Sequence, residues 1–221
     1  MKLLNHKYFD VIEVTEDNPE TLIIEEPVLF RNVIDELNYQ INNDDGDYVL
    51  SDSSSKILSL SKSVMLITDI NNLDIYTKQL KNKLTNIIVN NYSDVEGKEQ
   101  LIEMLNEIGV RIINSLPYSA TYKSNIAFND LVKFLDFSFD YSTLTILESL
   151  TEIISTSFEI LKYKVLVTVN LKDYLEKKEL EEITKYFAYK KIPLLMIERH
   201  QHVELDDYNH TRIIDKDLCV I

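Results

Sequence analysis

Residues 62–85 read KSVMLITDINNLDIYTKQLKNKLT, and this stretch decides the expected fold. Four consecutive apolar residues at 64–67 are typical of a strand that is buried on both faces of a sheet. Thr68 and Asp69 end this strand, and Asp74 suits the N-cap of a helix. Apolar residues then recur at helical spacing. The order of strand, turn and helix predicts the first half of a nucleotide-fold unit.

The turn after this strand lacks the glycines that a phosphate-binding loop requires. Such a loop brings backbone N–H groups close to an anion, and glycine permits that approach. Here the turn reads TDINNL and contains an acid. The chain has three glycines, and neither the kinase-type phosphate loop nor the dinucleotide fingerprint occurs in it. The architecture therefore favours a nucleotide-type fold, while the turn argues against nucleotide hydrolysis.

Composition sets the broad class of the protein. The 221 residues, 45% of them hydrophobic, suffice for one large domain or for one domain that carries a sub-domain. Cys219 is the single cysteine, and the beginning MKLLNHKY lacks the apolar run of a signal peptide. No run reaches membrane-spanning length. We therefore expect a cytoplasmic protein without a membrane partner.

The formal net charge is −14, which argues against nucleic-acid binding by the average surface. A local basic patch can coexist with that charge, and divalent cations can screen part of it. The charge alone thus leaves both a DNA-binding protein and a protein scaffold open.

The periodicity predicts a head that is split in sequence. Strand patterns occur at 21–25, 64–67, 164–170 and 193–198, and we expect a last one within 212–221. Between them, residues 77–162 carry long apolar stripes at helical spacing, which suit core packing and also an oligomer surface. We expect residues 1–76 and 163–221 to form an α/β head with a mostly parallel sheet, and residues 77–162 to form an inserted helical leg.

Three places carry possible cation ligands, and each has a simpler interpretation. The acidic turn at 42–47 resembles a calcium loop, but its first ligand position falls on Ile41, so a solvated loop is favoured. Asp69 ends a strand where open α/β sheets hold ligands, and it also suits a cap of the following turn. His200 and His202 alternate after a strand as a two-histidine site would, but a clear third ligand is missing and a surface loop is favoured.

Two further sets of charged residues are functional candidates. The first set lies on and near the helical insertion and can line a path for a polyanion, or can be ordinary solvated lysine: Lys78, Lys81, Lys83, Lys123 and Lys133. The second set surrounds the turn before the long helix at 144–161: Asp136, Asp140 and Glu148. Hard oxygen ligands at this density suit Ca²⁺, and acids at a helix start are equally typical.

Several strings occur in a specific order along the chain. They are TLIIE at 21–25, VMLITDI at 64–70, LTILE at 144–148, VLVTVN at 165–170, LLMIE at 194–198 and IIDKD at 213–217. Together they resemble the small CRISPR-associated protein of type II-A systems that acts in spacer acquisition. The resemblance covers nearly the whole chain, and residues 96–140 match least.

This resemblance implies a fold and a function. The fold is an α/β head, similar to phosphate-loop ATPases without the loop, with a helical leg. Four copies form a ring that threads double-stranded DNA, prefers free ends and is stabilised by Ca²⁺. The family has no catalytic activity and works beside the CRISPR integrase pair and the RNA-guided nuclease. Glu148 matches the family's calcium acids by position, and we extend the set to Asp136 and Asp140.

Three hypotheses follow. The preferred one is a non-enzymatic ring that binds DNA ends, acidic outside and basic inside. The alternative is a protein–protein scaffold of the adaptation complex whose nucleotide fold has decayed and which binds no DNA. The third is a metal-dependent nuclease or phosphatase that uses Asp69 and the segment with His200 and His202.

Overall fold

The structure is a computed structural model that describes residues 1–202, 204–206 and 210–220, without the side chains of residues 74 and 75. The chain divides into two compact units. We call residues 1–76 with 144–221 the α/β unit, and residues 77–143 the helical unit. These units divide the chain after residues 76 and 143, and the expected division was after residues 76 and 162.

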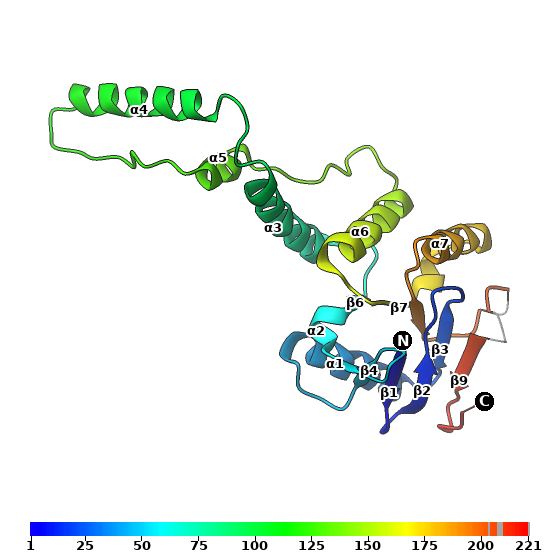
Figure 1. Ribbon diagram of the computed structural model, residues 1–221. Coiled ribbons are helices and arrows are strands. Elements are labelled where there is room, and N and C mark those ends of the chain that lie inside the picture. The colour runs from blue at the N-terminus through cyan, green and yellow to red at the C-terminus, as the bar shows by residue number, and fades with distance from the viewer. Residues whose placement is uncertain (203, 207–209, 221) are drawn as a thin grey trace. The chain divides into compact units, whose positions relative to one another are not determined.

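A five-stranded parallel sheet is the centre of the α/β unit (Figure 1). In spatial order its strands are β6 (Val64–Ile67), β7 (Val165–Val169), β8 (Leu194–Glu198), β3 (Glu20–Ile24) and β9 (Thr211–Ile214). Every neighbouring pair is parallel. The apolar runs of β6, β7 and β8 are buried along their whole length, as expected for strands covered on both faces. The predicted α/β class with a parallel sheet and an additional helical part is confirmed.

A second, antiparallel sheet completes this unit. Its spatial order is β2 (Phe9–Glu13), β1 (Lys2–Asn5), β4 (Val49–Ser51) and β5 (Ile57–Leu58). Its buried side chains belong to the same core cluster as one face of the parallel sheet. The two sheets therefore share a single hydrophobic core.

Helix α1 (Pro27–Asn43) packs into that core through Val33 and Leu37. Pro27 at its first turn has the backbone angle that a helix start requires. Tyr48 ties the helix to the small sheet, because its hydroxyl donates to the Val33 carbonyl oxygen at 2.8 Å. The short helix α2 (Leu60–Ser63) then leads directly into β6.

Leu175, Leu180, Ile183 and Phe187 recur at a spacing that predicts one helix over about 172–190, but the structure has two separate pieces there. A 3-10 turn, η1 (Leu171–Tyr174), follows β7, and α7 (Lys177–Tyr189) begins after a break. Glu179 causes the restart, since its carboxylate accepts the Glu176 backbone N–H at 2.9 Å and so caps the new helix.

Helix α6 (Ile146–Leu161) explains the different domain boundary. The sequence placed it in the leg, but in the structure it belongs to the α/β unit. Its face with Leu150, Ile153 and Ile154 is buried, and the Ser155 hydroxyl lies 2.8 Å from the Tyr186 hydroxyl on α7. The apolar stripe of α6 is therefore buried within the α/β unit.

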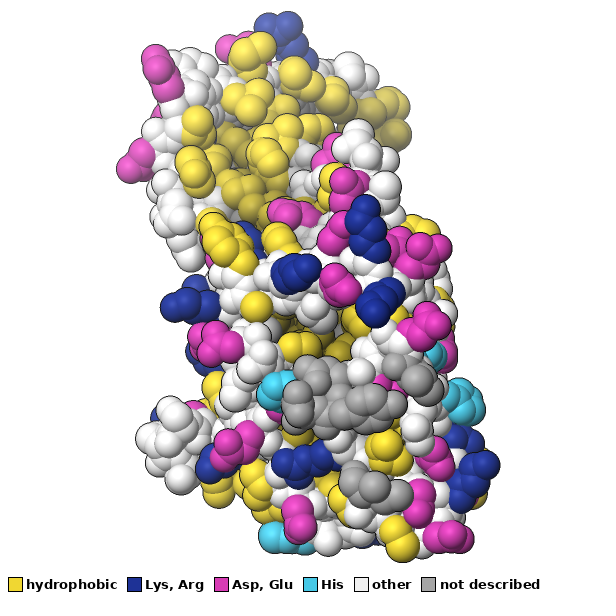
Figure 2. All heavy atoms as spheres, turned by 90° about the vertical axis from the view of Figure 1, so that its right-hand side faces the viewer, with side chains coloured by type: hydrophobic (Ala, Val, Ile, Leu, Met, Phe, Trp, Pro, Cys, Tyr) yellow, Lys and Arg dark blue, Asp and Glu magenta, His cyan; other side chains and the backbone are white. Residues whose placement is uncertain are grey.

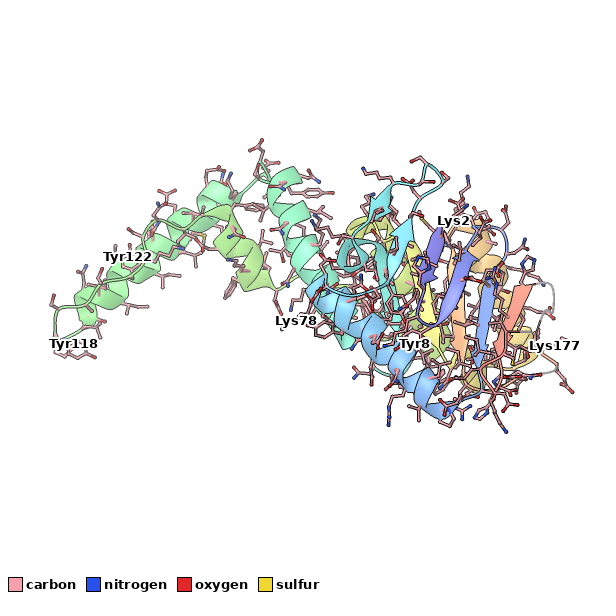
Figure 3. All side chains as sticks on the ribbon, turned by 90° about the horizontal axis from the view of Figure 1, so that it is seen from below. Lys2, Tyr8, Lys78, Tyr118, Tyr122 and Lys177 are labelled. Carbon is pink, nitrogen blue, oxygen red and sulfur yellow. The ribbon has the colours of Figure 1, made fainter. Side chains whose placement is uncertain are left out.

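The helical unit contains most of α3 (Asp74–Asn91), with α4 (Lys98–Ser115) and α5 (Phe128–Leu135). An extended segment at 116–127 returns along α4 and includes Tyr118 and Tyr122 (Figure 3). The Tyr122 hydroxyl donates to the Asn106 carbonyl oxygen at 3.2 Å, and its ring lies against Gly109. A methyl group added at Gly109 would approach the ring to 2.6 Å, so the segment packs against α4 only because a glycine stands there.

The other face of α4 is apolar and exposed. None of its residues is buried, and Met104, Ile108 and Ile112 expose about half of their surface or more. Figure 2 shows hydrophobic side chains gathered over this unit, in the upper part of the view. Among the described residues, no helix combines the length and the hydrophobicity that are needed to cross a bilayer.

Candidate nucleic-acid interface

Helix α3 carries the first group of candidate lysines. Lys78 and Lys83 are exposed, and Lys78 points outward from α3 in Figure 3. The Lys81 ammonium lies 2.7 Å from a carboxylate oxygen of Asp136, and its side chain is 39% exposed. From residue 75 to residue 93 the chain contains these three lysines and no acid. This stretch is therefore the most consistently basic one in the helical unit.

A polar hollow of about 420 Å³ lies between α3 and α5. It is lined by Lys81, Asn82, Thr85, Asn86, Asn129, Val132, Lys133 and Asp136. Ammonium and amide groups donate hydrogen bonds to phosphate oxygens, so this lining suits a nucleic-acid backbone. Asp136 at the rim opposes an anion and neutralises Lys81. The structure thus brings Lys81 and Lys133 together, which their sequence separation did not reveal.

Lys123 has a different environment from the other candidates. Its ammonium lies 2.6 Å from a carboxylate oxygen of Asp130, which also accepts the Ala127 backbone N–H at 2.9 Å. The hydrogen bond from Lys123 is the main reason that the pKa of Asp130 is lowered. Lys123 therefore fixes the start of α5, and its charge is largely balanced.

The three acids nominated for Ca²⁺ each have a local role. Asp136 ends α5 in the left-handed conformation, and Asp140 accepts the Ser142 backbone N–H at 2.9 Å. Glu148 forms a capping box with Thr145, whose backbone N–H donates to it at 2.8 Å. Hydrogen bonds from Ser142 and Thr145 lower the pKa values of Asp140 and Glu148.

These acids have the right donor chemistry for Ca²⁺. Asp136 and Asp140 belong to the helical unit and Glu148 to the α/β unit. Over residues 1–202, 204–206 and 210–220, no three His, Cys, Asp or Glu side chains are arranged to hold a metal ion. Within each unit, the described residues therefore do not assemble a calcium site, and the three nominated acids stay a prediction.

The other possible metal ligands are also separated. Asp69 accepts the Asn71 backbone N–H at 2.9 Å and so caps its turn. His202 lies 3.3 Å from Asp173, whereas His200 is exposed and His210 lies 3.0 Å from Glu20. Asp69 thus acts as a cap of its turn, and His200 and His202 lie in different surroundings.

The acidic turn at 42–47 has a capping role at the end of α1. Asp44 is the C-cap of that helix and accepts hydrogen bonds from the Ser59 and Ser61 hydroxyls at 3.0 and 2.8 Å. These two bonds are the main reason that its pKa is lowered. The turn thus joins α1 to the entrance of α2.

The connection from β3 to α1 ends in a helix start that is capped by a carboxylate. β3 is an interior strand, whereas β6, on which the sequence argument centred, is at the edge of the sheet. The Glu26 carboxylate accepts the Leu29 backbone N–H, and this bond is the main reason that the pKa of Glu26 is lowered. A side-chain carboxylate thus uses a donor that a phosphate would need at this helix N-terminus. Glu26 before Pro27 was a readable signal that the sequence analysis missed.

A buried ionic cluster was also missed. The Lys172 ammonium, next to β7, lies 2.6 Å from Asp206 and 3.2 Å from the Thr21 hydroxyl oxygen. Glu198 at the end of β8 is fully buried, and it accepts the Lys172 backbone N–H at 3.3 Å. Burial raises the pKa of Glu198 to about 7. The acid that ends the apolar run at 194–198 was the only sequence signal.

Comparison with known proteins agrees with this architecture. The family described as CRISPR-associated protein (Cas_Csn2) matches residues 40–218. The crystal structure of Stu0660 of Streptococcus thermophilus is similar with a TM-score of 0.63 at 13% identity, over 96% of this chain and 74% of that one. At that identity the structural likeness shows the fold, while the family match spans most of the sequence. The chain therefore belongs to the Csn2 family of CRISPR-associated proteins, the type II-A adaptation family that its ordered strings resemble.

Proposed function

We propose that this protein is a non-enzymatic ring that binds the ends of double-stranded DNA during spacer acquisition. The observation that carries the proposal is the acid-free stretch of α3, whose Lys81 shares a polar hollow with Lys133 of α5. Phosphate contacts of this kind give affinity with little sequence preference. A protein that captures DNA of many sequences needs that property.

The distribution of charge supports this surface. Residues 77–143 contain seven Lys and Arg and eight Asp and Glu, so the helical unit carries −1 of the total charge of −14. The α/β unit carries the remaining −13. Electrostatic repulsion of DNA is therefore concentrated on the α/β unit, and the helical unit is the part that a DNA duplex can approach with the least net repulsion.

The non-enzymatic part of the proposal rests on the start of α1. The Glu26 carboxylate accepts a hydrogen bond from the first turn of this helix, where a nucleotide phosphate would otherwise be held. With three glycines in the chain, no glycine-rich loop can provide the donors instead. Nucleotide hydrolysis of the phosphate-loop type is therefore not part of the proposed function.

Assembly is the second part of the proposal. An amphipathic helix with an apolar face that nothing covers within the chain is typical of a subunit interface. We assign the exposed face of α4 to contacts between copies in a homotetramer. The integrase pair and the RNA-guided nuclease are the proposed protein partners, and Ca²⁺ is the proposed cation, whose effect is tested directly.

The test is a gel shift with a linear duplex and a covalently closed circle of the same sequence, in Ca²⁺ and in a chelator. Binding of the linear form alone is expected, because a closed ring can load only over an end. Equal binding of both forms would contradict threading. Light scattering on the same samples should report four chains, and a stable monomer that shifts DNA would contradict the ring.

The alternative function is a scaffold that binds proteins and no DNA. The charge of −13 on the α/β unit and the exposed face of α4 favour it. If the folded, multimeric protein shifts neither DNA form, with or without Ca²⁺, the scaffold is the correct function.

A further inference from the structure

The α/β unit contains a hollow of about 440 Å³ whose lining includes none of the residues proposed to contact DNA. It lies where α6 leads into β7 and α7 leads into β8, at the amino ends of these parallel strands. Its size is within the range of about 300–1,000 Å³ for small-ligand pockets. Because the hollow lies at the amino ends of the strands, it is on the opposite edge of the sheet from the one where parallel sheets usually hold nucleotides.

Three lysines line this hollow: Lys164, Lys190 and Lys191. Their backbones are fixed, since the N–H of Lys164 donates to Ser63 at 2.7 Å and that of Lys191 donates to the Ala188 carbonyl oxygen at 3.0 Å. Their side chains are exposed, and none forms an ion pair with any residue that the structure describes. The Lys190 ammonium lies 5.7 Å from the centroid of the Tyr186 ring, a cation–π contact that leaves its charge unneutralised. Three lysines without an ion pair thus line one space in a unit that is otherwise strongly acidic.

The remaining lining is aromatic and acidic. Phe158 and Tyr163 lie with their ring centroids 6.3 Å apart, and both line the hollow. Glu16 and Glu159 add two exposed carboxylates. Aromatic faces stack on nucleobases, and carboxylates accept hydrogen bonds from the amino groups of bases. The lining therefore has separate partners for a phosphate, for a flat ring and for an amino group.

We propose that this hollow binds a nucleoside monophosphate, either free or as the 5′-phosphorylated terminal nucleotide of a DNA strand. The lysines contact the phosphate, while the aromatic rings and the glutamates contact the base. The two carboxylates and the C-terminal ends of α6 and α7 oppose a larger negative charge, so a single phosphate is favoured over a triphosphate. Binding of a free nucleotide does not depend on the proposed function, whereas binding of the terminal nucleotide of a DNA strand rests on it.

The first experiment titrates the full chain with AMP, adenosine and inorganic phosphate in a calorimeter. We expect saturable binding of AMP that is tighter than that of either fragment. The combined substitution Lys164→Gln, Lys190→Gln and Lys191→Gln should weaken AMP binding at least tenfold. The control Lys178→Gln with Lys185→Gln changes exposed lysines of α7 that already face glutamates, and it should leave AMP binding unchanged.

The second experiment compares duplexes with 5′-phosphate and 5′-hydroxyl ends. A several-fold preference for the phosphate that is lost in the triple variant identifies the DNA end as the source of the nucleotide. AMP binding without this preference identifies the free nucleotide. AMP binding that survives the triple substitution, or neither AMP binding nor a preference for the phosphate, overturns the proposal.

The two proposals fail separately. Substitution of Lys78, Lys81 and Lys83 by Gln should weaken duplex binding whatever the end chemistry, and it should leave AMP binding unchanged. Loss of duplex binding with intact AMP binding therefore reports on the helical unit alone.

Discussion

The ammonium nitrogen of Lys172 lies 2.6 Å from a carboxylate oxygen of Asp206, and these side chains are only 1% and 3% exposed. Asp206 also accepts the His202 backbone N–H at 2.8 Å, so the same carboxylate holds the backbone of His202. A buried ion pair costs desolvation on both sides, and removing one partner strands the other charge. Removal of either partner should therefore destabilise the α/β unit strongly.

We expect Asp206→Asn to lower the free energy of unfolding by about 3–5 kcal/mol, because the buried Lys172 ammonium then loses its ion-pair partner. The double variant Lys172→Met with Asp206→Leu should recover most of that loss. Urea unfolding of both variants measures the difference. A single variant that is as stable as the double one would show that the pair does not act as a unit.

The second prediction concerns Glu198 and pH. Burial raises its pKa from 4.5 to about 7, so the folded state holds this proton more strongly than the unfolded state does. The resulting stabilisation is fully present below pH 4.5 and is lost as the pH rises to 7. Glu198→Gln removes the titrating group and should stabilise the protein by about 2–3 kcal/mol at pH 8, with little effect at pH 4.5.

The measurement for Glu198 is the difference in unfolding free energy between variant and wild type across this range. Other titrating groups cancel in that difference. A difference that is flat with pH would mean that Glu198 keeps its ordinary pKa.

The third prediction concerns Gly109 and Tyr122. Alanine at a helical glycine normally stabilises by about 1 kcal/mol, but here the added methyl would meet the Tyr122 ring at 2.6 Å. We expect Gly109→Ala to displace the ring and to expose the 116–127 segment to limited proteolysis. In a Tyr122→Ala background the same change should be stabilising. Equal effects in both backgrounds would mean that the ring does not pack on the glycine.

The fourth prediction concerns the lysines of α3. Replacing Lys78, Lys81 and Lys83 by Gln should reduce the slope of log affinity against log salt by about two to three, because each lost phosphate contact removes about 0.9. Fluorescence anisotropy with one duplex at several salt concentrations measures the slope. Lys178→Gln with Lys185→Gln is the matched control. An unchanged slope in the triple variant places the DNA contact elsewhere.

The fifth prediction separates two roles of Asp136. Its carboxylate lies 2.7 Å from Lys81, so Asp136→Asn frees that ammonium and should strengthen duplex binding a few-fold. The response to Ca²⁺ should stay the same, because no three His, Cys, Asp or Glu side chains among the described residues are arranged to hold a metal ion. Weaker binding that no longer responds to Ca²⁺ would instead identify Asp136 as a calcium ligand.

Much of the α/β unit was predictable from sequence, because its apolar runs have one interpretation. The strand at 64–67 and the strands at 165–169 and 194–198 are buried on both faces, and such strands leave continuous hydrophobic signals. The break before α7 was missed because Leu175 and Leu180 keep helical spacing across it. Only the capping contact between Glu176 and Glu179 marks the restart.

The candidate site was less predictable, since it depends on contacts between distant residues. Composition identified the lysines of α3, but periodicity does not show that Lys133 joins Lys81 around one hollow. The same holds for Lys172 and Asp206, which are 34 residues apart. The grouping of α6 with the head depends on Ser155 meeting Tyr186, a contact between separate helices.

The unequal charge of the two units also determines how the molecule meets nucleic acids in a crowded mixture. The unit that carries −13 repels the many phosphates of a long polynucleotide, and the repulsion grows with the number of phosphates that lie near it. A single terminal phosphate at a local group of lysines meets much less of this repulsion. Under the proposed function, the acidic surface therefore lowers the affinity for bulk polynucleotide, and the lysines of the nearly neutral unit stay available for a DNA end.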